Sequence, residues 1–343
     1  MSTRDADVAV IGAGPVGLFA VAALGQVGLS SVVIDALAQA GGQCTALYPE
    51  KPIFDIPSRP EISAARLIDD LLLQAAGYAP QYLLGKRVDT VQQRDERFVL
   101  GLSHGQSVTA GAVLVAAGAG AFGPNRPPLP GIEAFEGSSV FYAVQSPERF
   151  RGKTVVIAGG GDSAADWAVL LAEVAASVTL VHRRAVFRAA PATLAALDRL
   201  AGAGRVTLAA PRALKGLIGS AGQISAVILS DDQGGEHAIE ADALLCFFGL
   251  AKDMSAISGW DLGADRNGIP VEPVGMKTRR AGVFAAGDIA HYPGKLKLIL
   301  TGFAEAASAA HAARSYLYPE RSFHFQYSTS LGKPGPQLTQ KEA

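Results

Sequence analysis

The sequence predicts an α/β fold in which one dinucleotide-binding βαβ domain is inserted into another. The first observation is the stretch 7–35, where an apolar strand pattern, a G-x-G-x-x-G turn, an Ala- and Leu-rich helix and a second strand follow one another. The second is the stretch 154–182, which repeats this order at the same internal spacing. The third is the segment 283–288, an apolar strand pattern ending in Gly-Asp, which would return the chain to the first domain.

The glycine turn of the first stretch has the features of a Rossmann-like nucleotide site. Gly12 permits the tight turn, Gly14 lets a pyrophosphate approach the backbone, and Gly17 lets the helix pack closely on the strand. The N-terminus of the following helix would present free N–H groups to the phosphates. Asp35 ends the second strand, where a carboxylate can accept both hydroxyls of a ribose. These features together favour dinucleotide binding over a buried helix packed through Ala and Gly.

Composition narrows the class of protein. The 343 residues include 49% hydrophobic residues and 39 glycines, which suits two α/β domains with many tight turns. The net charge of −1 argues against nucleic acid as the main partner. The uncharged run 8–31 is long enough to span a bilayer, but glycines and Pro15 interrupt it, so we expect neither an anchor nor a signal peptide. Two cysteines without a CxxC motif and six histidines without ligand spacing predict no disulfide framework and no metal site, and we expect a cytoplasmic protein.

The second glycine turn differs from the first at the position that reads the ribose. Because the interval from turn to strand end is the same in both stretches, His182 stands where the first site has Asp35. Arg183 and Arg184 follow it, and guanidinium groups suit a phosphate dianion. A solvated basic edge is the plainer interpretation, but the shared spacing favours recognition of the 2′-phosphate of NADP(H). The expected NADPH-binding residues are Gly159, Gly161, Ala164, His182, Arg183 and Arg184.

We expect residues 1–122 and 283–343 to form the first domain and residues 123–282 to form the second. The Pro-rich stretch 123–130 would carry the chain out of the first domain. Residues 323–343 are too polar and too rich in Pro and Gly for a further core element. Hydrophobic patterns add two helices and three strands to the first domain, at 62–76, 298–317, 87–91, 98–102 and 112–117.

These features resemble the thioredoxin-reductase-like flavoproteins, in which the first site holds FAD and the second holds NAD(P)H. The segment 41–43, Gly-Gly-Gln, and the Gly-Asp end of the returning strand carry this resemblance together with the two glycine turns. The redox disulfide of thioredoxin reductase is missing, because Tyr142 and Gln145 stand at the two cysteine positions. Electrons would therefore leave the flavin directly for an acceptor outside the protein.

A closer resemblance is to the type-2 ferredoxin–NADP⁺ reductases, which are similar to thioredoxin reductase without its cysteines. It covers nearly the whole chain, and its most specific parts are 47–51, 55–57, 292–299 and 328–330. The resemblance implies that NADPH gives a hydride to FAD and that single electrons then pass to ferredoxin or flavodoxin. No side chain would need to act as an acid or base. The resemblance also implies a homodimer.

The resemblance extends to the individual contacts with FAD. Tyr48 would stack on one face of the isoalloxazine ring, and Tyr327, from the same chain or from the partner subunit, would cover the other face. Asp288 would bind the ribityl chain, and the helix from 298 would point its N-terminus at the pyrimidine end of the flavin. The alternatives are a turn-forming or capping role for Asp288 and an ordinary half-buried loop position for Tyr327. With the glycines of the turn, and with Val88 acting through its backbone, the expected FAD-binding residues are Gly12, Gly14, Gly17, Asp35, Gln43, Tyr48, Val88, Phe122, Asp288 and Thr329.

Two other functions remain as alternatives. An NADPH oxidase or quinone reductase on the same scaffold needs no protein partner, whereas a flavoprotein redox sensor would be read by a partner in its long-lived reduced state. Turnover with ferredoxin, compared with oxygen or quinone, separates these hypotheses. An acidic electron carrier would meet a basic surface. The candidate residues, for which a merely solvated charged edge is the alternative, are Lys277, Arg279, Arg280, Lys295 and Lys297.

Overall fold

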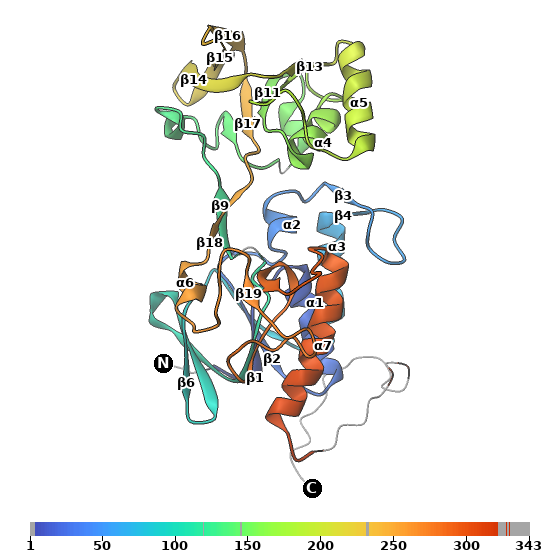
Figure 1. Cartoon of the computed structure of the whole chain (residues 1–343), viewed down its shortest axis with the longest axis vertical. Coiled ribbons are helices and arrows are strands. Elements are labelled where there is room, and N and C mark those ends of the chain that lie inside the picture. The colour runs from blue at the N-terminus through green and yellow to red at the C-terminus, as the bar shows by residue number, and fades with distance from the viewer. Residues whose placement is uncertain are drawn as a thin grey trace. The chain divides into compact units, whose positions relative to one another are not determined.

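The chain forms two compact units. The computed structural model describes residues 4–118, 120–144, 146–230 and 233–321, together with Tyr327 and Thr329, and for residues 121–124 and 250–253 it describes the backbone alone. Unit 1 comprises residues 1–122 and 252–343, and unit 2 comprises residues 123–251 (Figure 1). Between them run two connecting strands, β9 (Ala121–Pro124) and β18 (Leu250–Asp253), which pair with each other.

The chain returns to unit 1 earlier than the sequence analysis expected. The boundary lies between Ala251 and Lys252, whereas we placed it at residue 282. The physical reason is the packing of the next segment, because Ile257, Trp260 and Leu262 are buried in the main hydrophobic cluster of unit 1. Residues 252–282 therefore belong with the first nucleotide-binding domain and not with the inserted one.

Unit 1 is built on a mostly parallel sheet. Within the described residues this sheet has seven strands in the order β5-β2-β1-β8-β7-β6, with β20 also paired to β8. The pairs β5–β2, β2–β1, β1–β8 and β8–β20 are parallel, whereas the pairs β8–β7 and β7–β6 are antiparallel. The apolar runs predicted as strands thus form the buried centre of the sheet. The strands are β1 (Arg4–Ile11), β2 (Ser31–Asp35), β5 (Gln81–Leu84), β6 (Val88–Arg94), β7 (Arg97–Leu102), β8 (Ser107–Val115) and β20 (Val283–Ala285).

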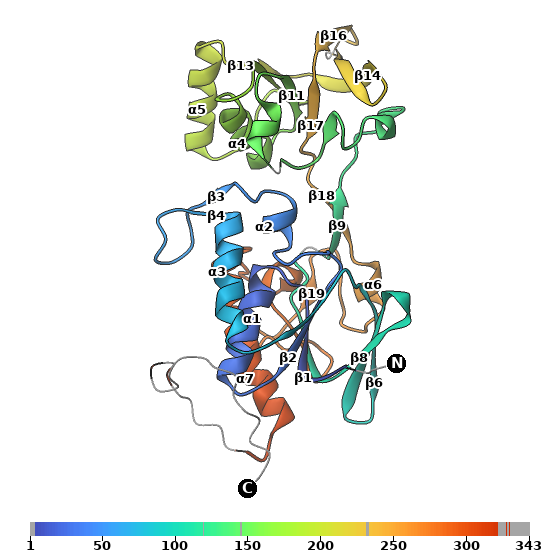
Figure 2. The same ribbon diagram turned by 180° about the vertical axis from the view of Figure 1, so that it is seen from behind.

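Three long helices of unit 1 pack together beside this sheet. Helix α1 (Pro15–Gln26) begins with a proline, which suits the first helical position. Helix α3 (Ala64–Ala76) is capped by Ser63, whose side chain accepts a hydrogen bond from the Arg66 N–H. Both α3 and α7 (Ile299–Leu317) contact α1, and the three helices lie side by side in both views (Figures 1 and 2). The smaller elements are α2 (Gln43–Ala46), α6 (Ser255–Ser258), β3 (Pro52–Ile53), β4 (Ile62–Ser63), β19 (Ile269–Pro270) and β21 (Ala290–His291).

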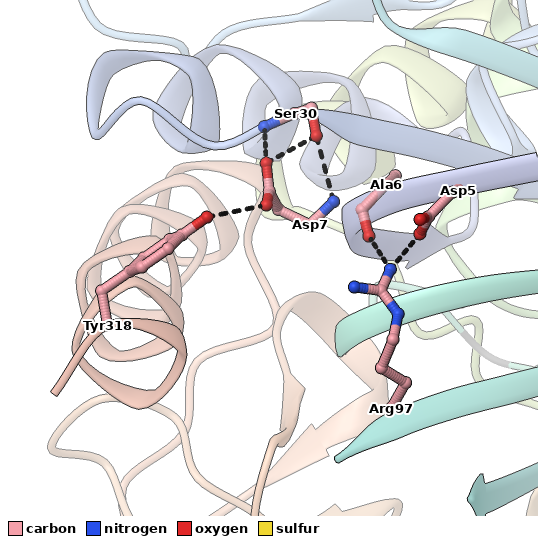
Figure 3. A network of polar contacts seen from close by, with 6 residues as sticks. All are labelled: Asp5, Ala6, Asp7, Ser30, Arg97 and Tyr318. Carbon is pink, nitrogen blue, oxygen red and sulfur yellow. Dashed lines mark hydrogen bonds and ion pairs between the residues drawn. The ribbon is translucent and has the colours of Figure 1, made fainter. Parts of the chain in front are cut away.

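A polar network ties the far end of α7 to the first strand (Figure 3). The Tyr318 hydroxyl, just after α7, donates to Asp7 Oδ1 at 3.1 Å. Asp7 Oδ2 accepts from the N–H and the hydroxyl of Ser30, at 2.8 and 2.6 Å. On the other side of β1, Arg97 pairs with Asp5 and donates to the Ala6 carbonyl oxygen at 3.1 Å. The hydrogen bond from Tyr318 to Asp7 thus attaches the C-terminal end of α7 to β1.

Unit 2 repeats the βαβ plan on a smaller scale. Its five-stranded parallel sheet, counted over the described part of the chain, has the order β10-β17-β11-β12-β13. Helices α4 (Asp162–Leu171) and α5 (Pro191–Gly202) pack against each other, and an antiparallel sheet of β14, β15 and β16 follows. The strands are β10 (Val140–Phe141), β11 (Thr154–Ala158), β12 (Ser177–Val181), β13 (Val206–Ala209), β14 (Ala213–Ser220), β15 (Gln223–Ser230), β16 (Glu236–Glu240) and β17 (Ala243–Cys246).

Candidate cofactor-binding sites

Unit 1 contains a cavity of about 780 Å³ at the carboxyl ends of its parallel strands. Ile11 ends β1, Asp35 ends β2, and Ala116 follows β8, and all three lie in the wall. Ligands of parallel α/β sheets bind at this edge, and pockets of this size hold cofactors. The wall brings together several residues predicted from the sequence as FAD contacts: Gly12, Gly14, Asp35, Gln43, Tyr48, Val88 and Asp288.

The first glycine turn is a tight cradle in this wall. A Cβ on Gly12 would lie 2.4 Å from the Ala116 carbonyl oxygen, and one on Gly17 would lie 1.8 Å from the Gly12 oxygen. Side chains do not fit there, so α1 starts directly against the turn. A Cβ on Gly14 would meet the Gly42 backbone only at 4.0 Å. This space, beside a helix N-terminus that no described side chain caps, fits a pyrophosphate.

Asp35 braces the glycine turn while it faces the cavity. Its Oδ2 accepts a hydrogen bond from the Ala13 N–H at 2.6 Å, and its Oδ1 accepts one from the Leu37 N–H at 2.8 Å. Burial raises the pKa of Asp35, and the two backbone hydrogen bonds act in the opposite direction. Each carboxylate oxygen can accept a further hydrogen bond, so Asp35 keeps the capacity to bind ribose hydroxyls.

Tyr48 lies on the side of the cavity formed by the Gly-Gly-Gln loop. Gly41 donates its N–H to the Ala13 carbonyl oxygen at 2.8 Å, which fixes this loop against the first turn. Burial raises the pKa of Tyr48, and the neighbouring Cys44 and Asp288 raise it further, so the phenol stays protonated. Tyr48 and Asp288 both line the cavity, so its wall holds the residues predicted to stack on the ring and to bind the ribityl chain.

The returning chain completes the opposite part of the wall. After β20, a short turn of 3-10 helix (Gly287–Ile289) presents Asp288 to the cavity. Lys297, Leu298 and Ile299 also line it, so the start of α7 points at the site. The side chains that the structure describes leave this N-terminus uncapped, as they do at α1. The cavity therefore receives the positive ends of two helix dipoles, which favours bound negative charge.

The sequence analysis missed part of the wall. Lys86, Arg87 and Asp89 line it beside Val88, and α6 contributes Ser255, Ala256 and Ile257. Trp260 is 3% exposed, and its indole N–H donates to the Asp89 carbonyl oxygen at 3.3 Å. Trp260 gave no distinctive signal in the sequence, because the helix before it, α6, spans only Ser255–Ser258. Assigning residues 252–282 to the inserted domain removed these residues from consideration.

Three predicted FAD contacts lie outside the described wall. The side chain of Phe122 is outside the described atoms, and the segments around Tyr327 and Thr329 are outside the described residues. The Tyr327 ring is 71% exposed, and Thr329 is also exposed. The proposed roles of these three residues at the flavin stay predictions.

Unit 2 carries the second glycine turn at the end of β11. A Cβ on Gly159 would lie 2.7 Å from the Ala164 Cβ, so Ala164 allows the close packing that Gly17 allows in unit 1. Gly161 precedes α4, whose N-terminus has no cap among the described side chains. The Arg188 N–H donates to the Gly160 carbonyl oxygen at 2.7 Å, which ties the turn to the segment after β12. This turn and helix can receive a second pyrophosphate.

His182 and the cations after it lie next to this second turn. The His182 ring covers Gly160 so closely that a Cβ there would lie 2.1 Å from ring atom Cε1. Burial lowers the pKa of His182, and the charges of Arg184, Arg183 and Arg188 lower it further. Arg183, Arg184 and Arg188 are exposed residues of the segment that follows β12. Such a cluster can bind a phosphate dianion.

The cysteines are placed for structure rather than for thiol chemistry. Cys44 and Cys246 are free and buried, and burial raises their pKa to about 11 and about 12. Tyr142 donates its hydroxyl to Glu136 at 2.6 Å, and Gln145 lies outside the described residues. Among the residues described, no His, Cys, Asp and Glu gather into a metal-binding group, and no helix is long and apolar enough to cross a membrane.

The predicted basic docking surface is corrected by the structure. The Lys295 side chain is 3% exposed and paired with Glu305, so it cannot face a carrier. Arg279 pairs with Asp261, and Arg280 donates to backbone oxygens of Val91 and Trp260. Three candidates remain at the surface: Arg279, whose side chain is 59% exposed, Lys277, whose Nζ lies 4.0 Å from Glu272, and Lys297 at the cavity.

Comparison with known proteins agrees with this architecture. Residues 6–313 match the family described as pyridine nucleotide-disulphide oxidoreductase. The ferredoxin–NADP reductase of Paramagnetospirillum magneticum is 53% identical over 97% of this chain and 99% of its own length. That of Granulibacter bethesdensis is 54% identical over 96% of this chain and 95% of its own length. The crystal structure of T. acidophilum thioredoxin reductase superposes with a TM-score of 0.79 at 23% identity, covering 91% of this chain and 98% of that one.

Proposed function

This chain belongs to the pyridine nucleotide-disulphide oxidoreductase family, and we propose that within it the protein is an FAD-dependent ferredoxin–NADP⁺ reductase. The observation that carries the proposal is the identity of more than half the residues, over nearly the full length, with relatives that bear this name. The two glycine turns, each beside a helix N-terminus that no described side chain caps, would supply the two nucleotide sites that this activity needs.

The cavity of unit 1 fits FAD. Gly14 and the N-terminus of α1 would hold the pyrophosphate, and Asp35 would hold the adenosine ribose. Tyr48 and Gln43 would bind the ring end, with Asp288 on the ribityl chain. When bound, FAD would take a hydride from NADPH and pass electrons singly to ferredoxin or flavodoxin. The residues of the wall would bind and orient the cofactor and shield it from water. Because the pKa of Tyr48 is raised, its hydroxyl stays protonated and can donate a hydrogen bond.

Unit 2 would select NADPH over NADH. Gly159 and the start of α4 would bind the pyrophosphate, as the corresponding turn does in unit 1. Arg183 and Arg184 would bind the 2′-phosphate, since their guanidinium groups are exposed next to the turn. The neutral His182 ring would shape the ribose side of the site without repelling these cations.

The absence of a cysteine pair separates this function from thioredoxin reduction. The sequence holds two cysteines in all, and both are buried with raised pKa values. A protonated, buried thiol is a poor nucleophile. The electrons would therefore pass from the cofactor to an external carrier without a protein disulfide.

The partner and assembly belong to the same proposal. An acidic carrier would approach the mouth of the cavity, where Lys297 lies exposed in the wall. The homodimer and the cytoplasmic location rest on the resemblance to type-2 reductases. Light scattering of the FAD-loaded protein measures the assembly directly, and a mass of one chain would contradict the dimer.

A two-step stopped-flow experiment tests the function. The FAD-loaded protein is reduced with one equivalent of NADPH, and it is then mixed with ferredoxin, flavodoxin, oxygen or a quinone. We expect rapid reoxidation by ferredoxin or flavodoxin and slow reoxidation by the other two. Faster reoxidation by oxygen or quinone identifies an oxidase or quinone reductase instead. A reduced form that persists with every acceptor identifies a redox sensor.

A further inference from the structure

Glu305 is a buried carboxylate beneath the cavity of unit 1. It lies on α7 and is 5% exposed. Its Oε2 accepts a hydrogen bond from the Gly287 N–H at 2.7 Å, and its Oε1 accepts one from the Tyr292 hydroxyl at 2.6 Å. Lys295 Nζ also donates to Oε1 and is itself buried, with its side chain 3% exposed. One carboxylate thus joins three segments: the turn before Asp288, the loop before α7, and α7 itself.

Burying the Glu305 carboxylate and the Lys295 ammonium lowers the stability of the fold unless each charge has a partner. A buried carboxylate or ammonium loses its hydration, and only close pairing with additional hydrogen bonds offsets the loss. Here the pair is supplemented by an N–H and a hydroxyl donor. Burial and the hydrogen bond to Glu305 raise the pKa of Tyr292 to about 12, so its hydroxyl keeps the proton that it donates. The sequence pattern around Lys295 had instead indicated a surface charge.

The position of this group connects it to the cofactor cavity. Gly287 and Asp288 both line the cavity, and the Gly287 N–H is bonded to Glu305. At the other end of the loop, Leu298 and Ile299 line the cavity as α7 begins. Glu305 therefore holds the two pieces of wall that carry the ribityl-binding acid and the α7 N-terminus.

Helix α7 and the turn at Gly287, which Glu305 joins, are closely packed against each other. A Cβ on Gly302, one turn before Glu305, would lie 2.3 Å from Val16 Cγ2 and 3.3 Å from the Gly287 Cα. Helix α7 is therefore pressed against the turn that Glu305 binds. A shift of the helix or of the turn would break the hydrogen bond to Gly287 and move the cavity wall.

We infer that Glu305 and Lys295 are positioning residues that fix Asp288 and the start of α7 around the flavin and set the charge beneath it. Neither residue lines the cavity among the described contacts, so they act through the wall. Because the pair is neutral as a whole, removal of one charge exposes the cavity to the other. A lone ammonium favours the electron-rich reduced flavin, whereas a lone carboxylate disfavours it. The inference rests on the proposed function only in taking FAD as the bound cofactor.

The opposite signs give a test that simple loosening of the fold cannot imitate. Glu305→Gln leaves the ammonium and should raise the flavin midpoint potential, while Lys295→Met leaves the carboxylate and should lower it. Both single variants should bind FAD at least about tenfold more weakly, because an unpaired charge is left buried. The Glu305→Gln/Lys295→Met double variant removes both charges and should recover much of the affinity and most of the potential. Glu272→Gln and Lys277→Met remove the charges of an exposed pair in the same unit and should change neither property.

A second measurement uses the protein without FAD. Hydrogen exchange of the segment 286–298 should be faster in each single variant than in the parent, and near the parent rate in the double variant. If the single variants do not fold, Tyr292→Phe removes one donor and should lower the potential while preserving the pair. Unchanged exchange, or potentials that shift in the same direction in both single variants, would overturn the inference. A parent protein that binds no FAD, yet exchanges more slowly than the single variants, would instead contradict the proposed function and support the positioning role of Glu305 and Lys295.

Discussion

Gly160→Ala should damage NADPH binding through the side chain of His182. A Cβ at this position would lie 2.1 Å from His182 Cε1 and 2.3 Å from each ring nitrogen. Carbon atoms in contact prefer about 3.5–4.0 Å, so the ring would have to retreat by more than about 1 Å. The His182 backbone cannot follow easily. Its N–H donates to the Ala209 oxygen at 3.1 Å, and its carbonyl oxygen accepts from the Arg212 N–H at 2.9 Å.

The expected loss of NADPH affinity follows from the position of the His182 ring next to Arg183 and Arg184. Displacing it disturbs the start of the segment that carries Arg183 and Arg184. One lost charge-assisted hydrogen bond to a phosphate costs about 1.5–3 kcal/mol. That loss raises the dissociation constant for NADPH by roughly 10- to 150-fold. NADH has no 2′-phosphate and should lose much less, and FAD content should stay that of the parent because the first cavity lies in unit 1.

The assay is calorimetric titration of the FAD-loaded protein with NADP⁺, NAD⁺ and 2′,5′-ADP. Gly202→Ala is the matched control, since it makes the same change in unit 2, where the new Cβ would have no described atom within 4 Å apart from its chain neighbours and the backbone of its own helix. It should leave all affinities unchanged and should not lower the unfolding temperature. Parent-like affinity of Gly160→Ala for NADP⁺, or an equal loss for NAD⁺, would refute the reasoning.

Three further predictions concern the same sites. Arg183→Ala and Arg184→Ala should each raise the KM for NADPH far more than that for NADH, by about 1.5–3 kcal/mol in apparent binding, and equal loss for both coenzymes would contradict phosphate recognition. The Cys44→Ser/Cys246→Ser double variant should retain NADPH-to-ferredoxin turnover, because burial keeps both thiols protonated at neutral pH; inactivity of the folded, FAD-loaded variant would show that a thiol takes part. Tyr327→Ala should alter the flavin absorption bands and the hydride-transfer rate if this ring covers the flavin, whereas parent-like spectra and single-turnover rates would make it an ordinary surface aromatic.

The parts of the fold that sequence predicted best are those with local signals. The strand ending at Asp35, the helix after Gly14 and the second βαβ unit each follow from short-range patterns of glycine and apolar residues. Helix α7 begins at Ile299, one residue after the expected start. In each case the residues that specify the element lie within the element or next to it, so one stretch of sequence contains the information.

The parts that sequence missed depend on contacts between distant segments. Lys295 looked exposed because lysine is almost never buried unless it is paired, and its partner lies in an Ala-rich helix whose pattern gave no sign of an inward carboxylate. The segment 252–282 was assigned to the inserted domain because the contacts that hold it are made far away in sequence. Trp260, for example, donates a hydrogen bond to the Asp89 carbonyl oxygen in β6. No local period records such a contact, so only the folded chain shows it.

The two glycine turns differ at their second residue, and the structure of each turn gives the reason. Ala13 and Gly160 are corresponding positions, as are Asp35 and His182, and in each unit the strand-end residue contacts the second residue of its turn. In unit 1 the contact is a hydrogen bond from a backbone N–H to a compact carboxylate, which leaves room for a methyl group. In unit 2 an imidazole ring covers the same position, so only glycine fits. The middle glycine of the second turn, Gly160, is therefore required by the histidine ring that lies over it. In the proposed NADPH site, coenzyme choice would therefore depend on the turn and the strand end together, and exchanging the strand-end residue alone would leave Gly160 without the ring that covers it.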